Sequence, residues 1–287
     1  MAKYLVTGAT GLLGNKVVKA LLKRVPAEQI AISVRDPHKA EEWAKLGVDV
    51  RQGDYEDAAS LDKAFAGIER LLLISSQGDN DTRIAQHKTA VAAAKKAGVQ
   101  FIAYTSVSKA TESKLFLAEV HKVTEAEIQA TGIPYAFLRN NWYVENETNT
   151  VKGVLAGAPL VTSAGQGLTG WTTREDYAEA AAAVLTGTGH ENRIYELSGK
   201  PSTYDEYAAA IAKAIGREVT VQHVDDAAYE QILAGAGLPA PVVEILSLIQ
   251  KAIRSGELEV HSNDLETLLG RPVTSLEEGV AEVVKGA

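Results

Sequence analysis

The sequence KYLVTGATGLLGNKVVKALLKR, from Lys3 to Arg24, contains three glycines at a spacing of three residues. Gly8, Gly11 and Gly14 separate a short apolar run from a stretch with apolar residues at helical spacing. A glycine-rich turn between a strand and a helix presents backbone N–H groups and the positive end of the helix dipole. The pattern therefore predicts a site for the diphosphate of a dinucleotide.

Each of the three glycines has a different steric role in such a turn. Gly8 permits the tight turn, Gly11 leaves room for the phosphates, and Gly14 lets the helix pack closely on the strand. The spacing is Gly-x-x-Gly-x-x-Gly, so the first turn is one residue longer than in Gly-x-Gly-x-x-Gly. Glycines in a loop can be purely structural, but the strand before them and the helix after them favour dinucleotide binding.

Composition narrows the class of protein. The 287 residues are enough for one large or two modest domains, and 29 Lys and Arg against 37 Asp and Glu give a net charge of −8. This charge argues against nucleic-acid and anionic-membrane partners. The absence of cysteine excludes disulfides, thiolate catalysis and Cys-ligated metals, and no His, Asp or Glu spacing indicates a metal site. No apolar stretch approaches the roughly 18–20 residues of a membrane span and no leader is recognisable, so we expect a cytoplasmic protein.

Apolar runs alternate with helix-type stretches through the first half of the chain. This alternation predicts βαβ units and a parallel sheet with helices on both faces, with strands at 4–7, 30–34, 48–51, 71–74, 101–105 and 135–138. Glycines at 98 and 132 are expected to end the helices that follow the fourth and fifth strands.

The pattern changes after about residue 140. Crowded glycines between 153 and 170 indicate turns and a crossover, followed by a helix near 174–185, a strand near 193–197, and mostly helices from 204, including an apolar one at 242–253. We predict an α/β fold, a Rossmann-type doubly wound parallel sheet with a smaller, mainly helical C-terminal lobe. Residues 1–152 are expected to form the NADP-binding domain, with 171–198 returning to it, and 153–287 the substrate-binding lobe.

The end of the second strand bears on the choice of cofactor. An acidic residue there takes the ribose hydroxyls of NAD, whereas a basic one accommodates the 2′-phosphate of NADP. Arg35 ends this strand, about 20 residues beyond the last glycine, and favours NADPH over NADH. Asp36 weakens this signal, Lys39 could add a second charge, and Arg35 could simply be a surface residue. Asp54 could reach the adenine edge or begin the next turn.

Several blocks together resemble one family. TGATGLLG at 7–14 is similar to the glycine turn of the atypical and extended short-chain dehydrogenase/reductases. The chain resembles their NmrA-like branch, and within it the group of type 2 NAD(P)H:quinone oxidoreductases and triphenylmethane reductases, through SVRDP at 33–37, GDY at 53–55, LLLIS at 71–75, FIAYT at 101–105, LRNNWY at 138–143 and TREDYA at 173–178. The blocks occur in the same order and cover most of the chain.

The resemblance implies a Rossmann domain that holds NADPH and a C-terminal lobe that closes a pocket over the nicotinamide. The cofactor contacts that it implies are Gly8, Ala9, Thr10, Gly11, Leu12, Leu13, Arg35, Ser75, Ser76, Gln77, Asn140, Asn141, Trp142 and Tyr143. These positions follow strand ends, where ligands bind in such sheets. Tyr104 and Trp171 are candidates for stacking on a flat substrate in the pocket, with core packing as the alternative.

The larger superfamily reduces carbonyls with a Tyr-x-x-x-Lys pair on the helix after the fifth strand. Aligning Glu125 with the glutamate that follows this pair places Leu117 at the tyrosine and His121 at the lysine, so the proton donor is missing. Hydride transfer to a quinone or a cationic dye needs mainly stacking and orientation. The catalytic residue is therefore unknown. His121 remains a candidate for ribose binding, proton donation or a place in the pocket wall.

We expect an NADPH-dependent reductase, monomeric or homodimeric, of small flat conjugated acceptors, quinones first and triarylmethane dyes second. One alternative is a non-catalytic NmrA-like redox sensor that binds NAD(P) and acts through a protein partner. Another is a reductase of a different activated C=C, C=O or C=N bond. The fold alone does not decide between these functions.

Replacing Arg35 with Asp is expected to remove the preference for NADPH, because the new carboxylate repels the 2′-phosphate and accepts ribose hydroxyls instead. The ratio of kcat/KM for NADPH to that for NADH measures this. An unchanged ratio in the variant would overturn the assignment of the cofactor.

Overall fold

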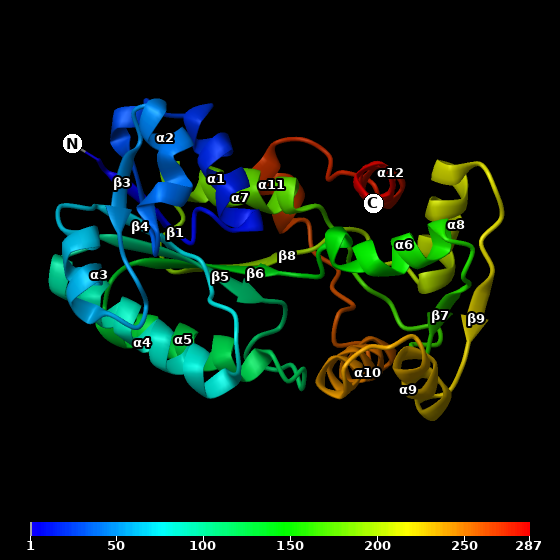
Figure 1. Ribbon diagram of the computed structural model, residues 1–287. Coiled ribbons are helices and arrows are strands. Elements are labelled where there is room, and N and C mark those ends of the chain that lie inside the picture. Colours follow the sequence, from blue (N-terminus) through cyan, green and yellow to red (C-terminus); the bar gives the residue numbers. More distant parts are fainter. Residues whose placement is uncertain (1) are drawn as a thin grey trace.

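The computed structural model describes residues 2–287 and contains a seven-stranded sheet in the order β3-β2-β1-β4-β5-β6-β8 (Figure 1). All neighbouring strands of this sheet pair in parallel. The chain begins in the middle of the sheet, runs out to β3, and returns to place β4 on the other side of β1. The strand order therefore reverses between β1 and β4, as in a doubly wound Rossmann-type fold. The predicted fold class is confirmed.

The strands of this sheet lie close to the predicted positions. They are β1 (Tyr4–Thr7), β2 (Ile30–Val34), β3 (Asp49–Gln52), β4 (Arg70–Leu73), β5 (Phe101–Val107), β6 (Tyr135–Asn140) and β8 (Arg193–Leu197). β5 and β6 continue past the predicted ends at 105 and 138. Their last residues include the buried polar side chains of Ser106 and Arg139, which an apolar pattern does not reveal. Both side chains are satisfied by the buried carboxylate of Glu125.

Helices cover both faces of the sheet (Figure 1). One face carries α1 (Leu12–Leu22), α2 (Glu41–Lys45), α7 (Arg174–Thr186) and α11 (Asp264–Leu269), and the other carries α3 (Ala58–Phe65), α4 (Asn80–Ala97) and α5 (Ala118–Thr131). α1 packs on α7, and α4 packs between α3 and α5. α4 and α5 end at Gly98 and Gly132, both in the left-handed conformation with φ of 74° and 77°. The predicted helix ends are confirmed.

A smaller part lies at the right of Figure 1, beyond the ends of β5 and β6. It contains α6 (Thr148–Leu155), β7 (Leu160–Thr162), α8 (Tyr204–Ile215), β9 (Val221–His223), α9 (Asp226–Gly235), α10 (Ala240–Arg254) and α12 (Leu276–Gly286). Short 3₁₀ helices, η1 (Ala27–Gln29), η2 (Pro37–Ala40) and η3 (Val144–Glu147), complete the elements. β7 and β9 form a two-stranded parallel sheet that the sequence analysis did not predict. Three residues are too few to show a period.

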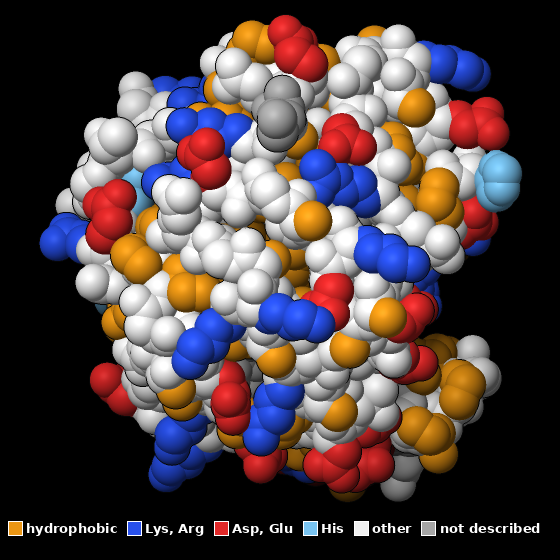
Figure 2. Space-filling view, turned by 90° about the vertical axis from the view of Figure 1, so that its left-hand side faces the viewer, with side chains coloured by type: hydrophobic (Ala, Val, Ile, Leu, Met, Phe, Trp, Pro, Cys, Tyr) orange, Lys and Arg blue, Asp and Glu red, His pale blue; other side chains and the backbone are white. Residues whose placement is uncertain are grey.

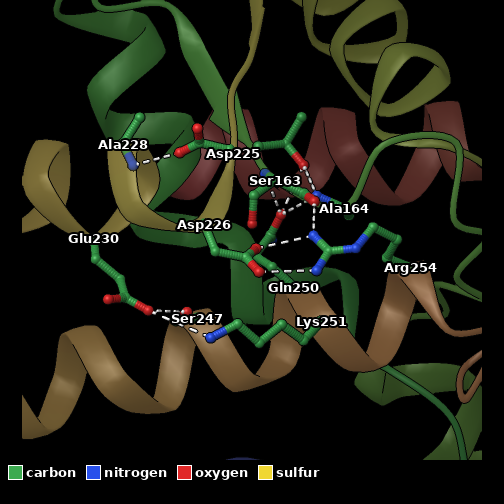
Figure 3. A network of polar contacts seen from close by, with 11 residues as sticks. Ser163, Ala164, Asp225, Asp226, Ala228, Glu230, Ser247, Gln250, Lys251 and Arg254 are labelled. Atoms are coloured by element: carbon green, nitrogen blue, oxygen red, sulfur yellow. Dashed lines mark hydrogen bonds and ion pairs between the residues drawn. The ribbon is translucent and has the colours of Figure 1, made fainter.

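Polar contacts join α9 to α10 and hold α10 to the loop after β7 (Figure 3). Both carboxylate oxygens of Asp226 accept hydrogen bonds from Arg254, each at 2.9 Å. The side-chain oxygen of Gln250 accepts the backbone N–H groups of Ser163 and Ala164, each at 3.0 Å. Helix α10 is therefore anchored by directional bonds as well as by its apolar face.

The C-terminal segment returns to the large sheet through α11, which packs on α7 and β8. Leu265 of α11 is buried in the same core as α1 and α7. The fully buried carboxylate of Asp176 on α7 accepts hydrogen bonds from the Arg271 guanidinium at 2.7 Å, from the Thr274 N–H at 2.8 Å and from its hydroxyl at 3.1 Å. Asp176 thus fixes the segment that leads from α11 to α12.

Replacing Asp176 with Ala is expected to lower the free energy of unfolding by roughly 1–3 kcal/mol, because it removes a buried acceptor and leaves the Thr274 N–H and hydroxyl without their partner. Urea denaturation monitored by circular dichroism measures this. Glu282→Ala, which removes an exposed carboxylate paired with Lys285, is the control and is expected to change stability by less than about 0.5 kcal/mol. Equal effects of the two substitutions would contradict the anchoring role of Asp176.

The surface view in Figure 2 shows the end of the molecule that lies at the left of Figure 1. Acidic and basic side chains are interspersed on this face, with apolar side chains between them. Within residues 2–287, every helix is too short or too polar to span a membrane.

Candidate active site

A cavity of about 720 Å³ lies beyond the carboxyl ends of β1, β2 and β4, where the strand order reverses. This size is in the range of small-molecule sites, roughly 300–1,000 Å³. The lining comes from the glycine turn, the ends of β2 and β3, the loop after β4 and the first turns of α4, with single residues from β5, α5 and the segments near 143 and 174. The sequence analysis expected a ligand at this edge of the sheet.

The glycine turn brings the start of α1 directly to this cavity. Gly8 has a φ of +61°, and a Cβ on Gly14 would lie 2.3 Å from the Gly8 carbonyl oxygen. Helix α1 begins after Gly11, with no side-chain cap and no acidic residue in its first turn. The first N–H groups of a helix lack partners within the helix, so this end is open to an anion. The turn therefore fits a nucleotide diphosphate.

The floor of the cavity is fixed by one tyrosine from the loop after β3. The Tyr55 hydroxyl donates to the Ile74 carbonyl at 2.7 Å and hydrogen-bonds to the Thr7 hydroxyl at 2.6 Å. The Ile74 N–H donates to the same Thr7 oxygen at 2.9 Å. Burial raises the pKa of Tyr55, so the phenol keeps its proton. These bonds connect the ends of β1 and β4 across the switch point.

Arg35 lines the cavity at the end of β2 with an exposed side chain. The neighbouring Asp36 is not a lining residue, because its carboxylate caps η2 by accepting a backbone N–H at 3.1 Å. Lys39 is not a lining residue either. Asp54 lines the cavity and also begins the next turn, where it accepts a backbone N–H at 3.1 Å. The geometry leaves Arg35 as the cation at this end of the cavity.

The cofactor contacts implied by the family resemblance separate into two groups. Those that line the cavity are Gly8, Thr10, Gly11, Leu12, Leu13, Arg35, Ser75, Ser76, Gln77 and Tyr143. Those that do not are Ala9, Asn140, Asn141 and Trp142. The side chain of Ala9 is packed in the core beneath the turn, and Asn140 is buried, donating to the Tyr143 hydroxyl at 3.2 Å.

Asn141 and Trp142 make contacts that join the sheet to the smaller part. The Asn141 amide donates to the Leu258 carbonyl at 3.0 Å. The Trp142 indole donates to the buried Glu147 carboxylate at 3.2 Å, and its ring packs in the core of the smaller part. Their positions after β6 suggested cofactor contact, but their side chains are used in connecting the two parts.

The two aromatic residues expected in the substrate pocket are not there. Tyr104 is 0% exposed, and Trp171 is 3% exposed. Trp171 packs against Tyr204 and Tyr207, with ring centroids 5.2 and 4.9 Å away. Both residues therefore pack in the core, which was the alternative given in the sequence analysis. A core aromatic and a stacking aromatic have the same sequence signature.

Tyr104 belongs to a buried polar network between α4 and α5. Arg83 donates through Nη2 to Nε2 of His121 at 3.2 Å. Because a guanidinium only donates, Nε2 is unprotonated and Nδ1–H donates to the Tyr104 hydroxyl at 2.8 Å. The same argument assigns the tautomer of His87, whose Nε2 accepts a hydrogen bond from the Ser76 N–H at 2.9 Å and is therefore unprotonated.

Comparison with known proteins agrees with this geometry. The sequence model that defines the NmrA-like family matches residues 2–279 of this chain. The chain belongs to the NmrA-like family. This NmrA-like protein is 42% identical over 279 residues to quinone oxidoreductase 2 of Escherichia coli strain K12, and the aligned residues make up 97% of each chain.

Solved relatives share the whole fold of the NmrA-like protein. Triphenylmethane reductase of Citrobacter sp. superposes with a TM-score of 0.92 at 44% identity, covering 99% of each chain. The NADPH complex of the Escherichia coli NADPH-dependent quinone oxidoreductase superposes with a TM-score of 0.93 at 42% identity, covering 98% of this chain and 99% of that one. The family resemblance read from the sequence is confirmed.

In this NmrA-like protein His121 is not among the residues that line the cavity, whereas its partner Arg83 is. Burial, and then the charge of Arg83, lower the pKa of His121 well below its usual value. The ring is therefore neutral, and both of its nitrogens are engaged. Leu117, at the position expected for a tyrosine, lines the cavity with an apolar side chain. This arrangement favours a support role for His121 over proton donation.

Sequence reasoning missed Arg83, His87, Tyr55 and Arg174 as residues that build this site. Arg83 and His87 are four residues apart on α4, a spacing that places them on one helix face. The guanidinium of Arg174 lies over the ring of Tyr143, 4.7 Å from its centroid. The i, i+4 spacing of Arg83 and His87 was the available signal, whereas the other two depend on contacts between distant segments.

Replacing His87 with Gln is expected to make the free energy of unfolding depend less steeply on pH under acidic conditions. Burial and the nearby Arg83 lower the pKa of His87 to about 3, whereas an unfolded histidine titrates near 6.5. Between these values the unfolded state binds an additional proton, so stability falls as the pH falls, by up to about 1.4 kcal/mol per pH unit. Gln can still accept the Ser76 N–H.

The free energy of unfolding, measured by urea denaturation between about pH 6.5 and 4.5, should therefore fall less steeply in His87→Gln than in the parent protein. His38→Gln, at an exposed histidine, is the matched control and should keep the parent slope. Identical slopes in the parent and His87→Gln would show that His87 is not held neutral.

Proposed function

We propose that this protein is an NADPH-dependent reductase that transfers hydride to flat conjugated acceptors, quinones first and triarylmethane dyes second. One observation carries the proposal. The apolar Leu117 occupies the place of a proton donor in the same cavity that the glycine turn and Arg35 line. The names of the Escherichia coli and Citrobacter relatives support this choice of acceptors.

The residues present fit NADPH. The first turn of α1, at Leu12 and Leu13, would hold the diphosphate, and Arg35 would hold the 2′-phosphate. The loop from Ser75 to Gln77 and the ring of Tyr143 would border the nicotinamide half. When bound, this cofactor supplies a hydride from C4 of its nicotinamide ring.

The protein contributes orientation and a shielded pocket rather than an acid. Tyr143 is held by the Asn140 amide at its hydroxyl and by the Arg174 guanidinium over its ring, so its face is a fixed wall. Burial raises the pKa of Tyr143, which keeps the phenol protonated. With Leu117 opposite a flat acceptor, correct stacking accounts for catalysis. A reduced quinone takes its proton from water, whereas a cationic dye that receives a hydride is already neutral and needs none.

The proposal also assigns nucleotide binding and acceptor binding to different segments of the chain. Residues 1–152, with 171–198 returning to them, would bind the nucleotide, and Arg174 of the returning segment lines the cavity. The lobe from residue 153 would bound the acceptor. A small planar molecule is the partner that this arrangement requires.

The test is steady-state NADPH oxidation by the purified protein with a benzoquinone, a naphthoquinone, a cationic triarylmethane dye and an activated enone. We expect a quinone to give the highest kcat/KM, on the order of 10⁴ M⁻¹s⁻¹ or more. Gly14→Val, whose side chain would displace the Gly8 carbonyl, is the control that removes nucleotide binding. Tight NADPH binding without reduction of any acceptor would refute the proposal and favour a redox sensor.

A further inference from the structure

Arg83 is a buried cation without an acidic partner. Its side chain is 6% exposed, and it lines the cavity from the first turns of α4. Its Nη2 donates to His121, its Nε has no hydrogen-bond partner, and within residues 2–287 no carboxylate forms an ion pair with it. Arg139, also buried, instead pairs with Glu125 at 2.7 Å and Glu196 at 3.0 Å.

An unpaired buried charge is unfavourable, so proteins pair buried cations with anions. The groups packed around Arg83 do not supply one. His121, Tyr104 and His87 are neutral, because burial lowers the pKa of both histidines and raises that of the tyrosine. Asp54 and Glu56 also line the cavity, but their carboxylates accept hydrogen bonds from the Glu56 N–H and the Gln86 amide and form no ion pair with Arg83. We therefore infer that the anionic partner of Arg83 is a ligand in the cavity.

The cofactor diphosphate is not placed to be this anion. Its site, at the start of α1, belongs to the helix layer that contains α7, whereas Arg83 approaches from the layer of α4 and α5 on the opposite face of the sheet (Figure 1). Gly78, in the connection before α4, is a lining neighbour of Arg83, with a Cβ position 4.0 Å from the Arg83 Cγ. Leu117, also a lining residue, lies one helical turn before His121, the hydrogen-bond partner of Arg83. Arg83 therefore faces the half of the cavity proposed for the acceptor.

We propose that Arg83 binds the oxyanion that forms on a quinone during its reduction and thereby makes the site selective for acceptors that become negatively charged. This inference rests on the proposed function. A quinone that receives a hydride gains one bond to hydrogen and one negative charge on oxygen, while NADPH is oxidised to NADP⁺. One proton from water then completes the hydroquinone.

A guanidinium in a low-dielectric site stabilises this charge as it develops, so its effect is larger in the transition state than with the neutral quinone. A cationic triarylmethane dye differs, because the hydride cancels its charge and yields a neutral product. No anion forms at any stage, and Arg83 gives that reaction no assistance. Comparing the rates for a quinone and for a cationic dye therefore distinguishes the role of Arg83 from general effects on folding or nucleotide binding.

The hydrogen bond from Arg83 to His121 makes the histidine a positioning residue. Nδ1–H of His121 donates to Tyr104, so Nε2 is fixed as an acceptor and holds one nitrogen of the guanidinium. Of the other donors, Nε is buried, and Nη1 is the terminal nitrogen left for a ligand in the cavity.

The experiment compares Arg83→Gln and Arg83→Lys with the parent protein for a naphthoquinone and for a cationic triarylmethane dye. We expect kcat/KM for the quinone to fall about 100-fold in Arg83→Gln and to be partly restored in Arg83→Lys. The value for the dye should stay within about threefold, and the Kd for NADPH should stay the same. Lys88→Gln removes an exposed cation of α4 that pairs with Glu127, and as the matched control it should change neither rate.

Binding of 4-nitrophenolate in the presence of NADP⁺ tests the anion site without turnover. Its affinity should fall about tenfold in Arg83→Gln, while that of neutral nitrobenzene stays the same. Parallel losses for quinone, dye and NADPH, or an unchanged nitrophenolate affinity, would overturn the proposal. Parent protein that reduced no quinone would refute the proposed function, whereas the nitrophenolate titration would still decide the anion site by itself.

Discussion

The position of helix α1 depends on the missing side chain of Gly14. A Cβ there would lie 2.3 Å from the Gly8 carbonyl oxygen and 2.8 Å from the Ala9 Cα, which no side chain tolerates. With hydrogen in its place, the helix begins immediately after the turn and directs its N-terminus at the cavity. The hydroxyls of Thr7 and Tyr55 then hold the end of β4 beside the same turn. One close backbone contact thus sets the geometry of the nucleotide end of the site.

The other end of the cavity is organised by a polar network without a carboxylate. His87 and His121 are each locked as the Nδ1–H tautomer, because a donor from Ser76 or Arg83 occupies the other nitrogen. Desolvation keeps both rings uncharged. The network therefore orders the loop after β4 and the side chain of Arg83 while adding no charge of its own. The positive charge that this network presents to the cavity is therefore that of Arg83 alone.

Fold and site differ in how far the sequence predicts them. Buried parallel strands consist of consecutive apolar residues, and a helix before Gly98 or Gly132 has a recognisable end, so the main sheet was predictable. The short strands β7 and β9 were not, since each has three residues and finds its partner about 60 residues away, at 160 and 221. Residues whose place depends on the local sequence, such as Gly8 and Arg35, were predicted from their neighbours in the chain, and both line the cavity.

Residues whose role depends on packing between helices were not found in this way. Arg83 became a cavity residue only when α4 and α5 were placed side by side. Tyr104, expected in the pocket, lies beneath it because β5 is covered by that same pair of helices. The sequence specifies the side chains of such a layer, but their exposure follows from the angle and depth at which the helices pack.

The departure from the Tyr-x-x-x-Lys pattern and the presence of Arg83 are linked by electrostatics. Nε2 of His121 lies 3.2 Å from the Arg83 guanidinium, so a lysine at position 121 would place a second buried cation against the first. Like charges at this distance in a desolvated layer destabilise each other. A neutral histidine accepts a hydrogen bond instead, and the cation is retained on α4. With histidine in place of lysine at position 121, a tyrosine at position 117 is no longer needed, because a tyrosine acid depends on the lysine that lowers its pKa. Leu117, His121 and Arg83 therefore form one consistent set, in which the proposed site would offer a fixed positive charge in place of a proton.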